Sequence, residues 1–270
     1  ADRGAFLRLV AAADATGAPV TLAAENLSLM RGGRTVVEGL TAALSSGRIT
    51  AITGPNGAGK SSLLLGLAGL LTSSAGAVTL EGSALATLPA RERAKAIGYL
   101  PQTPDIAWDV AVENLVALGR LPWRDRGTGA VEAALAALDL ADLRHRPASR
   151  LSGGERARAL LARVLAGSPR WILADEPLAA LDLAHQLALV AHLRACAAAG
   201  QGVVLVLHDL ALAMNHADHV LVLKEGRLIA EGPPAEALDP EVIREGWGVQ
   251  ARWLGEPGAM ALSSALPGAE

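Results

Sequence analysis

The residues with the clearest chemical potential are the eight from Gly54 to Ser61, which read glycine, four intervening residues, then Gly-Lys-Ser. This spacing is typical of a phosphate-binding loop, in which glycines let several backbone N–H groups turn toward one phosphate group. Lys60 would add a positive charge beside the β- and γ-phosphates, and Ser61 a hydroxyl ligand for Mg²⁺. A strand-like run at residues 49–53 precedes the loop, and a leucine-rich, helix-like run at residues 62–71 follows it. This order of strand, loop and helix favours a phosphate-binding loop over an ordinary glycine-rich turn. The predicted nucleoside triphosphate site consists of Gly54, Pro55, Asn56, Gly57, Ala58, Gly59, Lys60, Ser61 and Ser62.

Two carboxylates, Asp175 and Glu176, directly follow an apolar, strand-like run at residues 171–174. Ligands of open α/β sheets bind beyond the carboxyl ends of the strands, so we expect both acids to lie beside the phosphates. Successive side chains of a strand point in opposite directions, which suits one carboxylate facing a metal ion and the other facing water. Because many strands end in Asp-Glu, this prediction depends on the other motifs.

A second anion site is predicted where Leu151 is followed by Ser152, Gly153, Gly154 and Glu155. Ser152 has the position of a helix N-cap, the two glycines leave backbone N–H groups uncovered, and the helix that follows runs to about residue 166. The alternative is a helix cap that touches no ligand.

Together these motifs resemble those of the ATP-binding subunits of ABC (ATP-binding cassette) transporters, whose signature is Leu-Ser-Gly-Gly-Gln or Leu-Ser-Gly-Gly-Glu. The resemblance covers residues 22–248 in order and without large insertions. It implies an α/β fold: a P-loop NTPase core with a mostly parallel sheet, an antiparallel β portion and an inserted helical subdomain. It also implies that Ser152, Gly153, Gly154 and Glu155 act in trans, closing over the γ-phosphate that an opposite subunit holds.

The resemblance assigns roles to several residues outside the phosphate loop. Asp175 would hold Mg²⁺, usually through water, and Glu176 would be the general base that polarises the attacking water. His208, which follows an apolar run at residues 203–207, would reach the γ-phosphate and orient Glu176. Gln102 would reach both Mg²⁺ and the attacking water. The expected catalytic residues are therefore Glu176, His208 and Gln102.

Asp182 would belong to a loop that crosses the dimer interface and links the two ATP sites. The implied cofactors are ATP and Mg²⁺, with Ser61, Gln102 and Asp175 around the metal ion. A lone histidine at a strand end, or a lone glutamine in a loop, would not support these roles, so the assignments depend on the order of the motifs along the chain.

One departure from the family concerns the adenine ring, which usually stacks on an aromatic side chain near the first strand. The matching stretch here, residues 27–31, contains no aromatic residue. Arg31 offers a guanidinium for stacking on the base, and Met30 offers a softer apolar contact. The sequence therefore predicts phosphate binding more firmly than selectivity for one base.

The order of elements predicts three parts of the chain. Residues 1–20 form an N-terminal extension, residues 21–254 the ATP-binding domain with its helical subdomain at about 103–167, and residues 255–270 a loose tail rich in glycine, proline and serine. From residue 171 onward, strand-like and helix-like runs alternate, which favours a parallel sheet covered by helices.

Composition narrows the functional classes further. A net charge of −3 and a charged fraction of 19% show no general basic character, so we expect no nucleic-acid partner. A single cysteine, Cys196, indicates a reducing compartment and excludes an internal disulfide. No signal peptide and no membrane-spanning run are evident in the sequence, and the family resemblance implies a peripheral position at the cytoplasmic face of the cell membrane.

The cargo is predicted only from local resemblance. Exporters are often fused to a membrane domain, so its absence from this sequence favours an importer subunit. Residues 109–122 and 181–186 resemble the importers of iron–siderophores, haem and cobalamin, and we expect a metal chelate such as iron–siderophore or haem. The implied partners are a second, identical ATP-binding subunit, two permease subunits and a periplasmic or extracellular substrate-binding protein. The alternatives are another cargo (cobalamin, a metal ion or an exported molecule) and a non-transport ABC-type ATPase.

Overall fold

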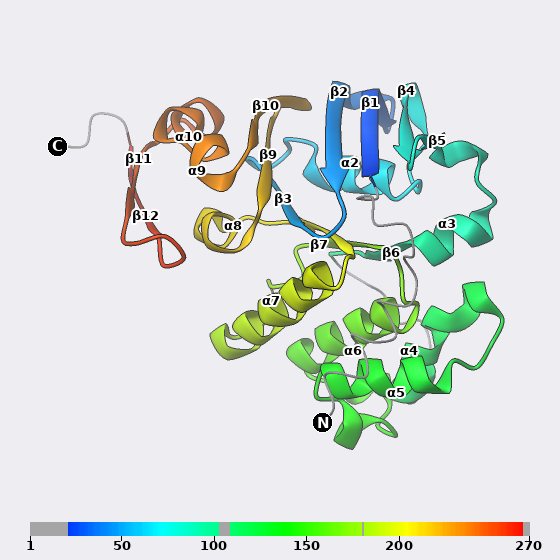
Figure 1. Cartoon of the computed structure of the whole chain (residues 1–270). Helices are drawn as coiled ribbons and strands as arrows, with labels where there is room; N and C mark the ends of the chain where they lie inside the picture. The colour runs from blue at the N-terminus through cyan, green and yellow to red at the C-terminus, as the bar shows by residue number, and fades with distance from the viewer. Residues whose placement is uncertain (1–20, 103–108, 180, 267–270) are drawn as a thin grey trace.

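The computed structural model describes residues 21–102, 109–179 and 181–266. Within them the chain forms a six-stranded sheet, a four-stranded sheet and a separate two-stranded hairpin (Figure 1). The predicted N-terminal extension, residues 103–108 of the predicted helical subdomain, residue 180 and the last four residues lie outside the described residues.

The six-stranded sheet carries the carboxyl-terminal strand ends on which the site prediction depends. Strands β9, β3, β8, β7 and β6 run parallel, and β10 joins antiparallel at one edge. The sheet order is β10 (Arg227–Gly232), β9 (His219–Lys224), β3 (Ile49–Thr53), β8 (Gly202–Val206), β7 (Trp171–Asp175) and β6 (Ile97–Leu100). Val, Ile and Leu residues dominate these strands because both faces of the sheet are buried.

The four-stranded sheet is antiparallel and begins with a hairpin that turns at Gly32 and Gly33. Its order is β2 (Arg34–Ser45), β1 (Thr21–Arg31), β4 (Ser73–Leu80) and β5 (Ser83–Ala84). Helix α2 (Lys60–Leu67) packs against this sheet on one side and against β7 and β8 on the other. The parallel sheet, the antiparallel portion and the helices confirm the predicted α/β fold.

Helical segments occupy most of the interval from residue 112 to residue 166, inside the predicted subdomain. They are α4 (Val112–Ala117), the 3₁₀ turn η2 (Leu118–Trp123), α5 (Thr128–Ala137), the turns η3 (Ala141–Leu143) and η4 (Ala148–Arg150), and α6 (Gly153–Ala166). The remaining helical pieces before β9 are η1 (Leu85–Thr87), α3 (Ala90–Ala96), α7 (Leu183–Ala198) and α8 (Leu210–His216). Figure 1 shows α4, α5 and α6 gathered on the side of the sheet away from β1 and β2.

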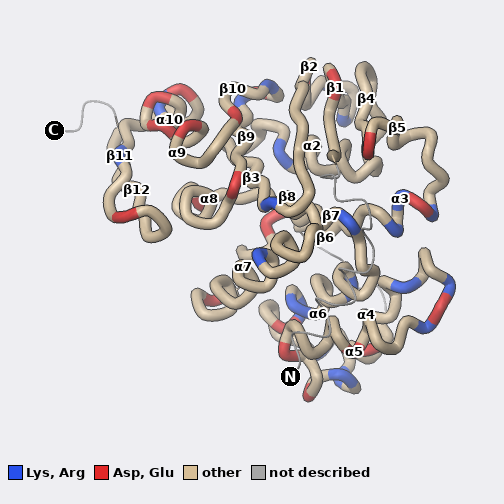
Figure 2. Tube along the Cα trace, in the orientation of Figure 1, with Lys and Arg blue, Asp and Glu red and all other residues tan. Residues whose placement is uncertain are grey.

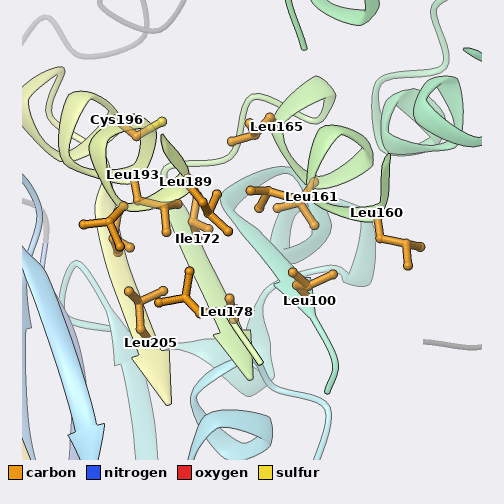
Figure 3. Packing of buried hydrophobic residues seen from close by; sticks show 14 of the residues in the cluster. Leu100, Leu160, Leu161, Leu165, Ile172, Leu178, Leu189, Leu193, Cys196 and Leu205 are labelled. Atoms are coloured by element: carbon orange, nitrogen blue, oxygen red, sulfur yellow. The ribbon is translucent and has the colours of Figure 1, made fainter. Parts of the chain in front are cut away.

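Two hydrophobic clusters, one on each face of the six-stranded sheet, hold these layers together. In β8, for example, Val203 and Leu205 belong to the cluster shared with α4, α5, α6 and α7, whereas Val204 and Val206 belong to the cluster shared with α2 and the four-stranded sheet. This alternation follows from the period of two along a strand. Figure 3 shows side chains of α6 and α7 meeting those of β7 and β8 in the first cluster. Because the two clusters are close-packed, they hold the strand ends in fixed positions.

The prediction of a loose tail from residue 255 was wrong for the described residues. After α9 (Pro234–Ala237) and α10 (Pro240–Trp247), strand β11 (Gln250–Leu254) pairs antiparallel with β12 (Ala261–Ala265). The side chain of Asn215 in α8 donates to the carbonyl of Met260 at 2.8 Å and accepts from its backbone N–H at 2.8 Å. These long-range hydrogen bonds order a segment whose glycine, proline and serine content predicts disorder.

The surface carries charges of both signs. Figure 2 shows Lys and Arg interspersed with Asp and Glu on the helical segments and around the sheets alike. Among the described residues, no helix combines the length and the apolar character needed to cross a bilayer.

Candidate functional site

The strand register brings the predicted site residues to one edge of the six-stranded sheet. Val206 of β8 pairs with Ile52 of β3 on one side and with Asp175 of β7 on the other. Leu100 of β6 pairs with Ala174. Asp175 is the last paired residue of β7, and the phosphate loop, Glu176, His208 and Gln102 follow the last pairings of neighbouring parallel strands, as the sequence predicts.

Two glycines shape the phosphate loop because no other residue fits their positions. Gly54 has a φ of +145°, and a Cβ there would lie 2.1 Å from the carbonyl oxygen of Leu223. Gly59 has a φ of +97°, and a Cβ there would lie 2.3 Å from the carbonyl oxygen of Val36. The loop thus packs directly on β9 and β2, and it leads straight into the N-terminus of α2, where backbone N–H groups favour an anion.

Lys60 lies buried at the start of α2 and points back into the loop. Its Nζ donates to the carbonyls of Gly54 and Pro55, each at 2.9 Å. Burial lowers the pKa of Lys60, while the charges of Glu176 and Asp175 act in the opposite direction. Burial removes water from the ammonium group and so disfavours its charged form. A phosphate anion beside Lys60 would favour the charged form.

Asp175 is buried at the end of β7, and the local chemistry fits a cation. Burial raises the pKa of Asp175, the neighbouring Glu176 also raises it, and a hydrogen bond from Ser61 lowers it. Among the described residues, Asp175 Oδ1 has no hydrogen-bond partner. A buried carboxylate oxygen without a donor is a suitable ligand for Mg²⁺ or for a water molecule bound to it. No group of three His, Cys, Asp or Glu side chains elsewhere in the described chain offers a metal site made of protein ligands alone.

Glu176 and His208 form a pair beside this group. Glu176 has a φ of +50°, a conformation that costs energy for a residue with a side chain and is often found at functional sites. Its backbone N–H donates to the carbonyl of Val206 at 3.2 Å, which ties the turn to β8. The carboxylate of Glu176 is hydrogen-bonded to Nε2 of His208. Contacts within the chain therefore define the orientation of the pair.

Most of these residues line one cavity of about 390 Å³, whereas Gly54, Pro55 and Asp175 are not among its lining residues. Besides the phosphate loop, Gln102, Glu176 and His208, its lining includes Arg31 and Val36 from the first hairpin. The sequence interpretation identified Arg31 as a candidate contact for the base but missed Val36. A short apolar side chain in a strand remote from the loop carries no sequence signal for ligand binding.

The signature residues and Asp182 are not among the residues that line this cavity. Ser152 is the N-cap of α6: its hydroxyl accepts from the backbone N–H of Glu155 at 3.3 Å, and the carboxylate of Glu155 accepts from the backbone N–H of Ser152 at 2.7 Å. Asp182 is the N-cap of α7. Both helix starts are capped, and neither contributes to the lining of the cavity in its own chain.

The amino-acid sequence is similar to those of ATP-binding proteins that take part in transport. Residues 37–179 match the ABC transporter family. The hemin import ATP-binding protein of Streptomyces coelicolor is 43% identical over 231 residues, covering 84% of this chain and 82% of that protein. The hemin import ATP-binding protein of Pseudomonas fluorescens is 44% identical over 237 residues, covering 85% of this chain and 93% of that protein.

Solved structures agree on the fold. A nucleotide-free ATP-binding cassette from an ABC transporter superposes with a TM-score of 0.74 at 25% identity, covering 83% of this chain and 97% of that one. A transporter described as of metal-chelate type, in an inward-facing conformation, superposes with a TM-score of 0.75 at 25% identity, covering 91% of this chain and 96% of that one.

Proposed function

Because the chain belongs to the ABC transporter family of ATP-binding proteins, we propose that it hydrolyses Mg²⁺-ATP to drive the import of haem or a related metal chelate through separate membrane subunits. The observation that supports hydrolysis most directly is the Glu176–His208 pair, held at the cavity that Lys60, Ser61 and Gln102 also line.

Each side chain has a separate task in this proposal. The phosphate loop and Lys60 bind the triphosphate through backbone N–H groups and one ammonium charge. Ser61, Asp175 and Gln102 would hold Mg²⁺, which would neutralise charge on the phosphates. Glu176 accepts hydrogen bonds from the attacking water and polarises it, and His208 orients the Glu176 carboxylate toward the γ-phosphate.

The first test replaces the carboxylate of Glu176. Glu176→Gln keeps the side chain's shape and removes the base, so ATP binding should persist while kcat falls by about 100-fold or more. Steady-state ATPase assays and calorimetric titration with Mg²⁺-ATP measure the two quantities. Glu231→Gln changes an exposed carboxylate on β10 in the same way and should leave both unchanged. Hydrolysis by Glu176→Gln at the wild-type rate would remove the residue from the catalytic role.

The proposed cargo rests on the relatives and on residues 109–122 and 181–186. The relatives are named hemin import ATP-binding proteins. The working assembly would contain two copies of this chain, two permease subunits and an external substrate-binding protein, with this chain at the cytoplasmic face of the membrane.

A growth experiment tests the cargo independently of the ATPase chemistry. Cells lacking this gene should fail to use haem or another iron chelate as their iron source while growing normally on inorganic iron. The wild-type gene should restore growth and the Glu176→Gln gene should not. Normal use of iron chelates, haem and cobalamin, together with loss of an unrelated nutrient, would overturn the cargo and leave the ATPase proposal intact.

A further inference from the structure

The first turn of α7 holds the loop that leads away from Glu176. The side-chain amide of Gln186 donates to the carbonyl of Leu178 and to the carbonyl of Leu181, each at 3.1 Å. Within the loop, Leu181 N–H donates to the carbonyl of Leu178 at 3.1 Å. These bonds tie Leu178 and Leu181 to the first turn of α7.

His185 contacts the side chain of Asp182, the residue that precedes α7. Its backbone N–H donates to Asp182 Oδ1 at 2.9 Å, which makes Asp182 the N-cap of the helix. Its ring Nδ1 lies 2.8 Å from Oδ1 and 2.9 Å from Oδ2 of the same carboxylate. An ionised carboxylate only accepts hydrogen bonds, so Nδ1 is the donor. The ring Nδ1–H and the backbone N–H of His185 therefore both donate to the carboxylate of Asp182.

The electrostatics agree with this geometry. The pKa of Asp182 is lowered, first by the backbone N–H of His185 and next by its ring. Both side chains are largely exposed, 46% for His185 and 67% for Asp182. Exposed pairs contribute little to the free energy of unfolding. The contact therefore matters for where the carboxylate points rather than for whether the chain folds.

We propose that His185 is a positioning residue: its Nδ1–H fixes the orientation of the Asp182 carboxylate that hydrolysis requires. The inference rests on the proposed ATPase function and on the role proposed for Asp182 between the two ATP sites. Gln186 holds the carbonyls of Leu178 and Leu181, and His185 holds the side chain of Asp182.

Three substitutions of His185 separate a positional role from a merely structural one. In His185→Asn the side-chain amide nitrogen takes the place of Nδ1, whereas in His185→Gln it takes the place of Nε2. His185→Leu has no donor. Beside the ring lies a cavity of about 110 Å³, also lined by Asp139 and Arg158, so a leucine has room. All three variants keep the backbone N–H of residue 185, which donates to the capping side chain of Asp182.

We expect His185→Leu and His185→Gln to lower kcat for ATP by about tenfold with little change in KM, because misplacing a positioned group slows the reaction more than binding. His185→Asn should stay within about twofold of the wild-type kcat. Three results would each overturn the proposal. The first is a wild-type kcat in His185→Leu or His185→Gln, and the second is a kcat in His185→Asn as low as that of His185→Leu. The third is a change confined to KM.

A double-mutant cycle ties the effect to Asp182. In an Asp182→Asn background, His185→Leu should cost little further activity, since the carboxylate that it orients is gone. Additive losses would contradict the proposal. Glu176→Gln, measured beside these variants, distinguishes a failure of the proposed ATPase mechanism from a failure of the role proposed for His185. Loss of hydrolysis in Glu176→Gln with full activity in His185→Leu overturns only the role of His185, whereas full activity in Glu176→Gln overturns the ATPase mechanism and the inference with it.

Discussion

Arg31 shows how a single residue decides what the site can recognise. It stands at the end of β1 and lines the cavity, as does Val36. The stretch from residue 27 to residue 31 has no aromatic side chain to stack on a base. A guanidinium can lie over any purine, and it carries no pattern of donors and acceptors that separates adenine from guanine in such a stack.

We therefore expect ATP and GTP to compete for the wild-type site within a few-fold of each other. Arg31→Ala should weaken both by roughly two- to fivefold, the effect of losing about 0.5–1 kcal/mol of exposed cation–π contact. Competition binding with the two nucleotides measures this, and Arg34→Ala, an exposed arginine on β2 outside the cavity lining, is the matched control. Tens-fold weaker binding of GTP would show that another group recognises adenine.

At the scale of elements, the C-terminal hairpin is attached to the rest of the fold by few polar contacts. Asn215 makes two hydrogen bonds to the backbone of Met260, and the ring N–H of Trp253 donates to the carbonyl of Leu238 at 2.8 Å. Trp253 and Leu262 also pack against the larger hydrophobic cluster. The hairpin lies beyond α8 and α9, away from the phosphate loop (Figure 1).

Asn215→Ala should release the hairpin locally without affecting hydrolysis. Removing two partly buried hydrogen bonds costs about 1–2 kcal/mol of local stability, so proteases should cut near residues 255–260 faster and Trp253 fluorescence should shift. Asn215→Asp keeps the acceptor for the Met260 N–H and loses the donor, so it should fall between the wild type and Asn215→Ala. Unchanged proteolysis in Asn215→Ala would mean that packing alone holds the hairpin.

Elements with strong local signals were predictable from the sequence, and elements held by remote contacts were not. Helix α6 ends at residue 166, as predicted, because Ser152 caps its start and Gly167 follows its end. The strands β3, β7 and β8 were recognised from continuous apolar runs, and the polar residues after them indicated the site. Strand β12 was missed because its sequence, Ala-Leu-Ser-Ser-Ala, has little apolar character and depends on Asn215, 45 positions away. The contact between His185 and Asp182 also needed the structure, since spacing alone does not orient a ring.

At the scale of the whole molecule, the signature and the phosphate cavity are separate surfaces of one chain. Gly153 is exposed at the first position of α6, and a Cβ there would meet no described atom within 4 Å. Its freedom from contacts within the chain is consistent with a surface that completes the site of a second copy. A substitution there should spare the fold and affect only the association of two chains.

Gly153→Asp should bind ATP normally but neither hydrolyse it nor form ATP-dependent dimers, because an added carboxylate would repel a partner's γ-phosphate. Size-exclusion chromatography with light scattering, using the Glu176→Gln background to slow hydrolysis, measures the dimer. Gly129→Asp makes the same change at another open position in the first turn of a helix and should behave as its parent. Cooperative hydrolysis retained in Gly153→Asp would show that the signature does not act in trans.

The chain has one cysteine, Cys196, which is fully buried on the inner side of α7. Burial raises the pKa of its thiol to about 12, so the nucleophilic thiolate is scarcely populated at neutral pH. The native protein is therefore suited to spectroscopic probes attached through introduced cysteines, without removal of the natural one. Spin labels or fluorophores at exposed positions of α6 and β2 would report distances between two copies as they associate, against a background free of labelling at Cys196.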